Sequence, residues 1–571
     1  MPNAFGAVVR RSRLTMGCHT PRRFPYTTPP ELRGAGGRLH QVVIVGAGPV
    51  GLAAAIDLAQ HGIHCIVLDD NDVVSIGSRA ICWSKRTLEI FDRLGVGERM
   101  LAKGVTWQVG RVYHRDQELY SFNLLPERGH KMRAFINLQQ YYVEEYLVER
   151  AAELEGLIQL RWKNRFLGLE LRDESVGVKV DTPDGPYRLE TRWLLAADGA
   201  RSAVRNALGL EFKGEEFEEK FLIADVRTAT DYPSDRRFWF QPTFDPSESV
   251  LVHRQPDDVF RIDFQLGWDA DVDAEREPAR VSERVHHVLG REARFEVQWC
   301  SIYTFRCARL GRFVHGRVLF AGDSAHVVSP FGARGGNGGI QDVDNLCWKL
   351  ALVAQGRAPR ALLESYNLER VHGSDENIRH SRRTTRFMTP KSVAERQLRD
   401  AALALARDFP FARTLVNSGR LSRPCSLERF AGTVASGNGV AGPMAPGMPC
   451  TDAPVMFSGQ RPGWLLETLG GDFTIVIFAV RAADAARRQA ELRAGGLRLP
   501  LRVIVPAAAA VTAENMESVL CDVQGLAGER YGGGPGVTYL IRPDQHVAAR
   551  FAIFDPAALA AAHASTIAWN N

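Results

Sequence analysis

A glycine-rich turn between apolar stretches most constrains the fold of this 571-residue chain. Residues 46–51 read Gly-Ala-Gly-Pro-Val-Gly, directly after a β-branched run and directly before the Ala- and Leu-rich segment 52–61; the next apolar run ends in Asp69. Strand, glycine turn, helix and strand form a βαβ unit, in which the glycines allow a tight turn and the close approach of a pyrophosphate. The acid is placed to accept hydrogen bonds from a ribose. We therefore expect an α/β domain that binds a dinucleotide, either FAD or NAD.

The distribution of charge argues against a nucleic-acid-binding body. The net charge is +5, but residues 1–38 hold seven arginines and one acid, so this segment alone carries +6 and the remainder −1. The remainder therefore lacks the basic excess that nucleic-acid binding requires. Residues 1–38 are rich in Arg, Pro, Gly and Thr, so we expect a disordered basic tail. An overextended start, with Met16 as the first residue, explains this tail better than a transit peptide, because its prolines break an amphipathic helix.

Cysteine usage and hydropathy bound the cellular setting. The chain has nine cysteines and no CxxC pair, which argues against a disulfide scaffold and against a metal site. A reducing, cytoplasmic location fits this usage. The longest uncharged apolar run, Val42–Ile56, falls short of the ~18 residues of a membrane span, so we expect no membrane partner.

Two later segments decide between FAD and NAD. Residues 193–205 read as a strand that runs into Asp-Gly and then a helix, and residues 316–326 read as a strand followed by Gly-Asp. The glycine-rich stretch 330–339 comes next. With the first glycine turn, these segments resemble, in the same order, the signatures of the class A FAD-dependent aromatic hydroxylases, the p-hydroxybenzoate and phenol hydroxylase family. The resemblance covers about residues 40–385 and extends to 3-(3-hydroxyphenyl)propionate hydroxylases.

The resemblance implies a Rossmann-type (GR2-like) FAD-binding domain of the α/β class, an inserted mainly-β substrate domain and a C-terminal thioredoxin-like domain. Without a CxxC pair, that last domain would be structural or would support a homodimer. The expected segments are the tail, 1–38; the FAD-binding domain, 39–105, 136–211 and 309–385; the substrate domain, 106–135 and 212–308; a helical connection and linker, 386–439; and the thioredoxin-like domain, 440–571.

The resemblance also implies residue roles. His326 could be either a site residue or a core histidine, and Ser329 stands where the family often has a further proline, which questions the local geometry near the flavin ring. The second glycine cluster, 532–536, follows no convincing strand and is expected to be a plain loop. The implied FAD contacts are Gly46, Gly48, Pro49, Gly51 and Arg79 at the pyrophosphate, Asp69 at the ribose, Gln140, Asp198 (also associated with NAD(P)H), Gly322 and Asp323 at the ribityl chain, and Pro330, Gly335, Gly336 and Asn337 near the isoalloxazine ring.

The implied activity is NAD(P)H- and O2-dependent hydroxylation of a phenolic substrate, ortho or para to its hydroxyl, through a flavin C4a-hydroperoxide. A 3-hydroxyphenyl carboxylic acid is the favoured substrate type. Strand alternation in the middle of the chain makes Trp239, His253 and Arg261 the pocket candidates, although only one strand face can point inward. No catalytic base can be assigned, and the choice of NADH or NADPH stays open. An FAD-dependent dehydrogenase without oxygen insertion and a non-catalytic FAD-binding scaffold remain alternatives.

Overall fold

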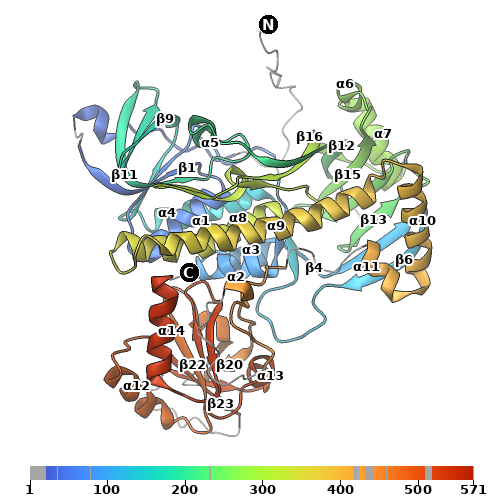
Figure 1. The fold of residues 1–571 in the computed structure, drawn as a ribbon. Coiled ribbons are helices and arrows are strands. Elements are labelled where there is room, and N and C mark those ends of the chain that lie inside the picture. The colour runs from blue at the N-terminus through green and yellow to red at the C-terminus, as the bar shows by residue number, and fades with distance from the viewer. Residues whose placement is uncertain are drawn as a thin grey trace.

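Within the described residues, the chain forms two eight-stranded sheets, a seven-stranded sheet and a three-stranded sheet (Figure 1). The first two sheets lie in the upper body of Figure 1, and the seven-stranded sheet forms a separate lower domain. This computed structural model describes residues 21–34, 37–77, 79–229, 233–416, 421, 423–430, 442–457, 460–507 and 517–569.

The first sheet is centred on β1 (Leu39–Val45), which pairs in parallel with β11 (Tyr187–Ala196) and with β2 (Cys65–Leu68). Parallel strands need both faces covered, and β1 is accordingly apolar and buried over its last four residues. The outer strands are β8 (Ile158–Arg161) beside β2, β18 (Val318–Phe320) and β17 (Val314–His315) beyond β11, and the antiparallel β10 (Val176–Asp181) and β9 (Arg165–Leu171).

Three helices pack on one another and on this sheet. They are α1 (Pro49–Gln60), α4 (Gln140–Ala152) and α8 (Gly335–Ala354). The 12-residue α1 begins at the glycine turn and buries Gly51 to Ala59, which explains why its sequence is apolar all round. Three shorter helices belong to the same body: α2 (Lys85–Arg93), which packs on α8, α3 (Gly97–Lys103) and α5 (Ala203–Ala207).

The second sheet is mainly antiparallel and carries the inserted segments. One of its faces packs against α7 (Pro278–Leu289), which follows the short α6 (Val272–Glu275). The other face meets α10 (Val393–Asp408) and α11 (Pro410–Val416) at one end. Its strand order is β19 (His326–Val327), β16 (Glu296–Arg309), β12 (Lys213–Arg227), β15 (Val259–Gly267), β14 (Ser249–Arg254), β13 (Arg236–Phe240), β5 (Val109–His114) and β6 (Gln117–Asn123).

Two elements connect the two large sheets. The long helix α9 (Leu362–Met388) runs across the body in Figure 1, from beneath the first sheet to the second. The three-stranded sheet lies between them, with the order β3 (Cys82–Ser84), β7 (Phe135–Asn137) and β4 (Val105–Trp107).

The C-terminal domain has its own sheet between helices. Helices α12 (Asp484–Ala494) and α14 (Pro556–Ala568) pack on one apolar cluster, and α13 (Leu526–Tyr531) packs on another. The Asp555 carboxylate caps α14 by accepting from the Ala557 and Ala558 N–H groups, and residues 532–536 form the expected loop. The strand order is β21 (Pro462–Trp464), β20 (Pro454–Met456), β24 (Val519–Asp522), β23 (Leu501–Pro506), β22 (Thr474–Phe478), β25 (Thr538–Ile541) and β26 (Val547–Phe551).

The expected disordered tail is wrong for its second part. Residues 21–34 pack on the first sheet, where the Phe24 ring stacks on Trp162 at a centroid distance of 4.5 Å. Arg161 donates two hydrogen bonds to Glu31, at 2.9 and 3.1 Å. Although burial opposes ionisation, hydrogen bonds from His40 and Arg161 lower the pKa of Glu31 to about 2. Residues 1–20, like residues 431–441 of the expected linker, lie outside the described residues.

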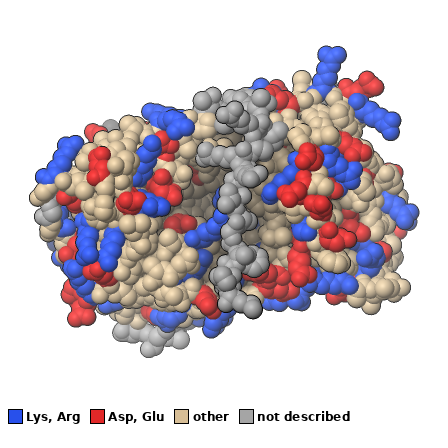
Figure 2. Space-filling model, turned by 90° about the horizontal axis from the view of Figure 1, so that it is seen from above, with Lys and Arg blue, Asp and Glu red and all other residues tan. Residues whose placement is uncertain are grey.

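The surface and the side-chain inventory limit other site types. On the face shown in Figure 2, basic and acidic side chains are interspersed and form no single basic patch. No helix in the described ranges is long and apolar enough to cross a membrane. The same ranges contain no group of three or more His, Cys, Asp or Glu side chains that could hold a metal ion.

Candidate functional site

A cavity of about 740 Å³ lies between the two large sheets. The glycine turn after β1 and the segment after β2 form one end of it, the first turn of α8 lies along its middle, and the inner face of the second sheet forms the other end. Carboxyl ends of parallel strands meet at this edge of the first sheet, which is where open α/β sheets bind ligands.

Each of the three positions 46, 48 and 51 in the turn requires glycine for a different structural reason. Gly46 has φ +106°, and a Cβ there would lie 2.5 Å from the Ala197 carbonyl oxygen. A Cβ on Gly51 would lie 1.9 Å from the Gly46 oxygen. Neither position tolerates a side chain. By contrast, no described atom lies within 4 Å of a Cβ built on Gly48, which borders the cavity beside Pro49. Gly48 therefore leaves space for a ligand, as the pyrophosphate role requires.

Two carboxylates border the cavity beside the glycine turn. Asp69 follows β2, accepts a hydrogen bond from the Ala47 N–H at 2.7 Å and is bound by Asn71. Asp198 follows β11 and accepts from the Val204 N–H at 3.1 Å, so it also binds the first turn of α5, whose N-cap is Ser202. Burial raises the pKa of both carboxyl groups. Oδ1 of Asp198 is buried and has no hydrogen-bond partner among the described residues. A donor group of a bound ligand would satisfy this oxygen.

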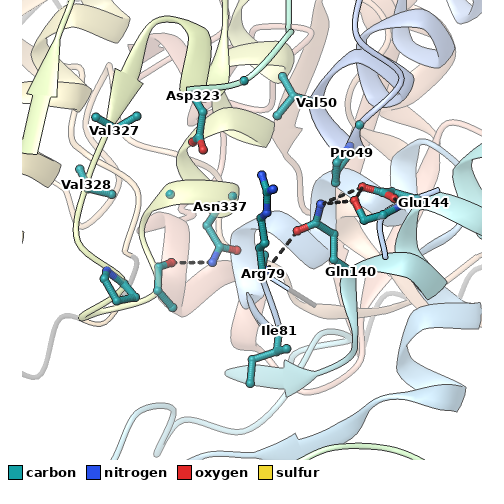
Figure 3. A pocket seen from close by; sticks show the side chains of 18 of the residues that line it. Pro49, Val50, Arg79, Ile81, Gln140, Glu144, Asp323, Val327, Val328 and Asn337 are labelled. Carbon is teal, nitrogen blue, oxygen red and sulfur yellow. Dashed lines mark hydrogen bonds between the residues drawn. The ribbon is translucent and has the colours of Figure 1, made fainter. Parts of the chain in front are cut away.

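Gln140 holds the loop that carries Arg79. Its Oε1 accepts from the Ala80 N–H at 3.1 Å, while its Nε2 donates to Ser75 Oγ at 3.0 Å and to Glu144 Oε1 at 2.8 Å (Figure 3). Burial raises the pKa of Glu144. The structure brings Gln140 to the cavity wall, but these bonds indicate that it orders the loop as well as bordering the site.

Arg79 and Asp323 point toward one another across the cavity (Figure 3). The guanidinium of Arg79 forms no hydrogen bond or ion pair with any described residue, and neither does the Asp323 carboxylate. Asp323 is open to the cavity yet surrounded by protein, and this burial raises its pKa. Gly322, at φ +63°, makes the turn that presents Asp323.

His326 belongs to the support of this turn. Its Nε2 lies 2.7 Å from Asp342 Oδ2, which also accepts from the Gly322 N–H at 2.9 Å. Arg370 donates to the other oxygen of Asp342 at 2.7 Å. Although burial opposes it, His326 and Arg370 lower the pKa of Asp342. His326 is 1% exposed and does not line the cavity. Of the two roles that the sequence left open, it is therefore a core histidine and not a site residue.

The first turn of α8 supplies backbone donors. Gly335, Gly336 and Asn337 line the cavity, and the first N–H groups of a helix have no partner inside it. The Asn337 side chain is engaged elsewhere: it donates to the Cys82 and Ala333 carbonyl oxygens and accepts from Ser84. The positive end of this 20-residue helix thus faces the cavity.

Near the same helix, Pro330 lines the cavity, and Ser329, which precedes it and stands where the family often has a further proline, accepts a hydrogen bond from Thr385 at 2.9 Å.

These features fit FAD. An open glycine for the pyrophosphate, an unpaired arginine, an orphaned carboxylate oxygen and a helix N-terminus lie along one cavity, and each is a group that a flavin dinucleotide would satisfy.

Known proteins agree with this reading. A family model described as "FAD binding domain" matches residues 40–381. The chain belongs to the class A FAD-dependent aromatic hydroxylase family. It is 32% identical over 360 residues to a flavin-dependent monooxygenase of Mycobacteroides abscessus, which covers 58% of this chain and 71% of that protein. It is also 29% identical over 545 residues to the 6-methylpretetramide 4-monooxygenase of Streptomyces rimosus, covering 91% of this chain and 92% of the relative.

Solved structures support the same fold. The flavin-dependent monooxygenase PieE, solved with FAD and substrate, superposes with a TM-score of 0.78 at 22% identity, over 93% of this chain and all of PieE. Aklavinone-11 hydroxylase, solved with FAD and aklavinone, gives a TM-score of 0.71 at 22% identity, with the same coverage of both chains. This hydroxylase therefore has the α/β FAD-binding monooxygenase fold, and its cofactor is FAD.

The substrate end of the hydroxylase cavity has an aromatic wall and a charged wall. The aromatic side chains come from β3, β4, β7, β16 and the loop before α8, and the charged ones come from the inner face of the second sheet. The aromatic residues are Trp83, Trp107, Phe135, Trp299, Tyr303, Phe305 and Phe331. Flat side chains of this kind suit a flat, apolar substrate ring.

One of the three expected pocket residues is wrong. Trp239 does not line the cavity: it stacks on Tyr113 at 4.9 Å and packs with Val250 and Val281 on the opposite face of the sheet. Successive side chains of a strand alternate between faces, so an error of one residue in choosing the face excludes the side chain. On the same strand, Arg236 is the residue that lines the cavity.

His253 and Arg261 do border the cavity, but Arg261 is already paired. Its Nε and Nη2 each donate to Asp225 at 2.8 Å. Burial, followed by Arg236 and Arg261, holds the pKa of His253 well below its usual value, so this imidazole stays neutral. The sequence analysis missed Arg236 and Asp263, although the period-2 pattern 261, 263 on β15 would have indicated Asp263 once Arg261 was placed inward.

Proposed function

We propose that this flavin-dependent hydroxylase oxidises NAD(P)H and uses O2 to hydroxylate a phenolic ring, ortho or para to its hydroxyl. The observation that carries the proposal is the cavity itself, in which an aromatic wall and a charged wall meet beside the first turn of α8. An apolar substrate alone would leave the charged wall uncompensated, whereas a phenol has both an aromatic ring and an ionisable oxygen.

Bound FAD would supply the electron transfer from NAD(P)H and the activation of O2. The chain would contribute position and electrostatics. Gly48 admits the pyrophosphate, Arg79 offers it a positive charge, and the N–H groups at the start of α8 stabilise negative charge on a neighbouring group. The aromatic wall would orient the substrate and exclude water from the reacting centre.

NAD(P)H would bind transiently across the FAD-binding domain. The sequence contains one glycine fingerprint in a βαβ context, and the second cluster, 532–536, lies in a loop between α13 and β25 of the C-terminal domain. The sequence therefore indicates no second dinucleotide-binding βαβ unit for NAD(P)H. The segment after β11, with Asp198, is the proposed contact for both dinucleotides.

Two substrate types deserve comparison. A 3-hydroxyphenyl carboxylic acid is supported by the 3-(3-hydroxy-phenyl)propionate/3-hydroxycinnamic acid hydroxylase of Mycolicibacterium smegmatis, 27% identical over 66% of each chain. The relative that aligns over nearly the full length is instead named for 6-methylpretetramide, which makes a substrate of that type the second candidate.

The test is effector-stimulated turnover. The purified holoprotein is mixed with NADH or NADPH, and nucleotide oxidation, O2 uptake and products are followed with 3-(3-hydroxyphenyl)propionate, 4-nitrophenol, anhydrotetracycline and aklavinone. Stimulated oxidation with a hydroxylated product supports the proposal. Slow oxidation that no phenol stimulates would indicate a dehydrogenase instead, and a flavin that NAD(P)H never reduces would indicate a binding scaffold.

We also propose that residues 440–571 form a thioredoxin-like domain with a structural role. In support, β22, α12 and β23 make a parallel βαβ unit, and an antiparallel pair, β25 and β26, joins the other side of β22 before α14. Cys450 and Cys521, its cysteines, are both free and buried, which suits packing better than redox chemistry.

A further inference from the structure

The charged wall of the cavity contains two acid–base combinations that differ in pairing. Across the second sheet, Arg261 lies in register with Asp225 on β12 and with His253 on β14. Two residues farther along β15, Asp263 lies in register with Ile223 and Leu251, which are apolar. Arg261 therefore has a carboxylate opposite it on a neighbouring strand, whereas both strands beside Asp263 place apolar residues opposite it.

Asp263 is left without a donor. Its Oδ1 is buried and accepts no hydrogen bond from any described residue, although the side chain lines the cavity. An unsatisfied buried carboxylate is costly, so a native structure that retains one at a cavity wall reserves it for a ligand.

Arg236 is the matching unpaired cation. It lines the same cavity from β13, and its guanidinium makes no hydrogen bond or ion pair within the part of the chain that the structure describes. Its charge nevertheless acts on Asp263. A ligand that satisfies both groups must give a proton to a carboxylate and present an oxygen to a guanidinium, and a phenol hydroxyl does both.

We propose that Asp263 is the catalytic base that takes the proton of the substrate's phenol hydroxyl, and that Arg236 binds the phenolate oxygen that remains. The inference rests on the proposed function, because it requires a phenolic substrate. The phenol O–H bond breaks, its electron pair stays on the phenolate oxygen, and the proton forms a new O–H bond on the Asp263 carboxylate. The resulting negative oxygen pushes electron density onto the ortho and para ring carbons.

The surroundings of Asp263 suit this role. Burial raises its pKa to about 7, Asp225 adds to the rise, and Arg261 and Arg236 oppose it. A base with a pKa near the working pH is effective in proton transfer.

The other groups on this wall are weaker candidates. His253 on β14 is a poor proton acceptor because its pKa is far below the usual value. The Cys82 thiol on β3 stays protonated because burial raises its pKa to about 12. Tyr303 on β16 also lines the cavity and interacts electrostatically with Arg261, which is already paired with Asp225.

The experiment compares Asp263→Asn with the wild-type holoenzyme on two probes. One is the weakly acidic phenol 3-(3-hydroxyphenyl)propionate, and the other is 4-nitrophenol, which is acidic enough to be largely ionised in mildly alkaline solution, where the two losses are compared. In the wild type, kcat/KM should rise with pH through an apparent pKa near 7. The variant should lose that inflection and fall ~100-fold or more with the weak acid. With 4-nitrophenol, which arrives as the phenolate, the loss should be less than ~10-fold, because no base is needed.

Arg236→Gln provides a readout that does not depend on turnover. In neutral solution, where only part of the free 4-nitrophenol is ionised, the wild-type holoenzyme should shift its visible absorption toward the phenolate on binding, and Arg236→Gln should lose this shift. Asp258→Asn is the matched control: this acid lies in the turn between β14 and β15, is exposed and is outside the cavity lining, and its positive φ of 56° suits Asn. It should keep the wild-type pH profile.

The outcomes separate the two proposals. A wild-type enzyme that no phenol stimulates overturns the proposed function. A stimulated wild type with an Asp263→Asn variant that keeps the inflection, or that loses equal activity on both probes, overturns the role of Asp263 alone. Should the Asn variant fail to retain FAD, Asp263→Glu must keep the inflection and part of the activity. Absence of any 4-nitrophenol shift in the wild type overturns the role of Arg236.

Discussion

Charged side chains gather in two regions of this molecule, and the two regions treat them differently. The first is the interface between α2, α8, α9 and the C-terminal domain, which we call the interdomain cluster: Arg86, Arg93, Asp344, Lys349, Glu369, Arg542 and Asp544. The second is the cavity, where Arg79, Arg236, Asp263 and Asp323 have no ion-pair partner among the described residues.

In the interdomain cluster every charge is matched. Glu369 accepts from Arg542 at 2.8 and 2.9 Å and from Lys349 at 2.7 Å. Arg86 donates to Asp344 at 2.9 Å and to the Asp544 carbonyl oxygen at 2.7 Å, which joins the FAD-binding domain to the C-terminal domain. Although burial opposes it, Arg542 and Lys349 lower the pKa of Glu369 to about 2.

The difference separates structural charges from ligand-binding charges. Both regions are enclosed, so desolvation is similar in kind, but only the cluster has compensation from within the chain. The cavity groups remain uncompensated until a cofactor or a substrate arrives. Substitutions in the cluster should therefore change stability first, and substitutions in the cavity should change ligand affinity first.

The largest effect should follow from breaking the cluster. Glu369→Ala would leave Arg542 and Lys349 buried without this carboxylate, and removing one partner of a buried pair costs about 3–5 kcal/mol. Denaturant unfolding of the holoprotein measures this free energy. Glu364→Ala, on the same helix, removes a surface partner of Arg312 and should cost about 0–1 kcal/mol. Equal losses in the two variants would contradict the assignment of the cluster as the structural region.

Asp323→Ala should show the reverse pattern. The carboxylate has no partner in the described protein, so its removal should leave the stability of the FAD-free protein unchanged or slightly higher. Loss of a charged hydrogen bond to FAD, worth about 1.5–3 kcal/mol, should weaken FAD binding roughly 10- to 100-fold and bleach the purified protein. Flavin fluorescence titration measures the affinity. A variant that retains stoichiometric FAD with unchanged affinity would refute the cofactor role of Asp323.

Asp344→Ala is the matched comparison for Asp323→Ala, because Asp344 is also an aspartate of the FAD-binding domain but is bound by Arg86 and Arg93. It should lower the free energy of unfolding in the FAD-free protein, where Asp323→Ala does not. If both variants behaved alike, the division between structural and ligand-binding charges would fail.

The FAD end of the cavity could be predicted from the sequence because its signals are local. A glycine turn, the acid after β2 and the Gly-Asp turn each occupy a few consecutive residues, and the structure brings Gly48, Asp69 and Asp323 to one cavity. Local motifs carry their geometry with them, since the turn and the flanking elements are encoded together.

The substrate end could not be predicted in the same way. Its residues come from separate strands, and their facing depends on register: Arg236 faces inward and Trp239 outward on one five-residue strand. Phe24 likewise packs on Trp162, a partner that no local pattern in residues 1–38 indicates. Long-range pairing decides both cases, and periodicity alone does not specify it.

The smallest effect, expressed per pH unit, should appear in the pH dependence of stability. Burial raises the pKa of Asp263 from the ordinary 3.8 to about 7, so the folded protein binds more protons than the unfolded chain between these values. The free energy of unfolding contributed by this group therefore falls as pH rises through that window, by at most about 1.4 kcal/mol per pH unit. Asp263→Asn removes the contribution, so the variant should gain stability relative to the wild type as pH rises from 3.8 to about 7, and the difference should level off above about 7. Denaturant unfolding at several pH values, with FAD saturating in both proteins, measures this difference.

Glu369 provides the opposite sign within the same molecule, because its lowered pKa contributes stability that is present above its ordinary 4.5 and is lost as pH falls toward 2. A stability difference between Asp263→Asn and the wild type that stayed flat with pH would show that Asp263 is already compensated, and the cavity would then resemble the interdomain cluster.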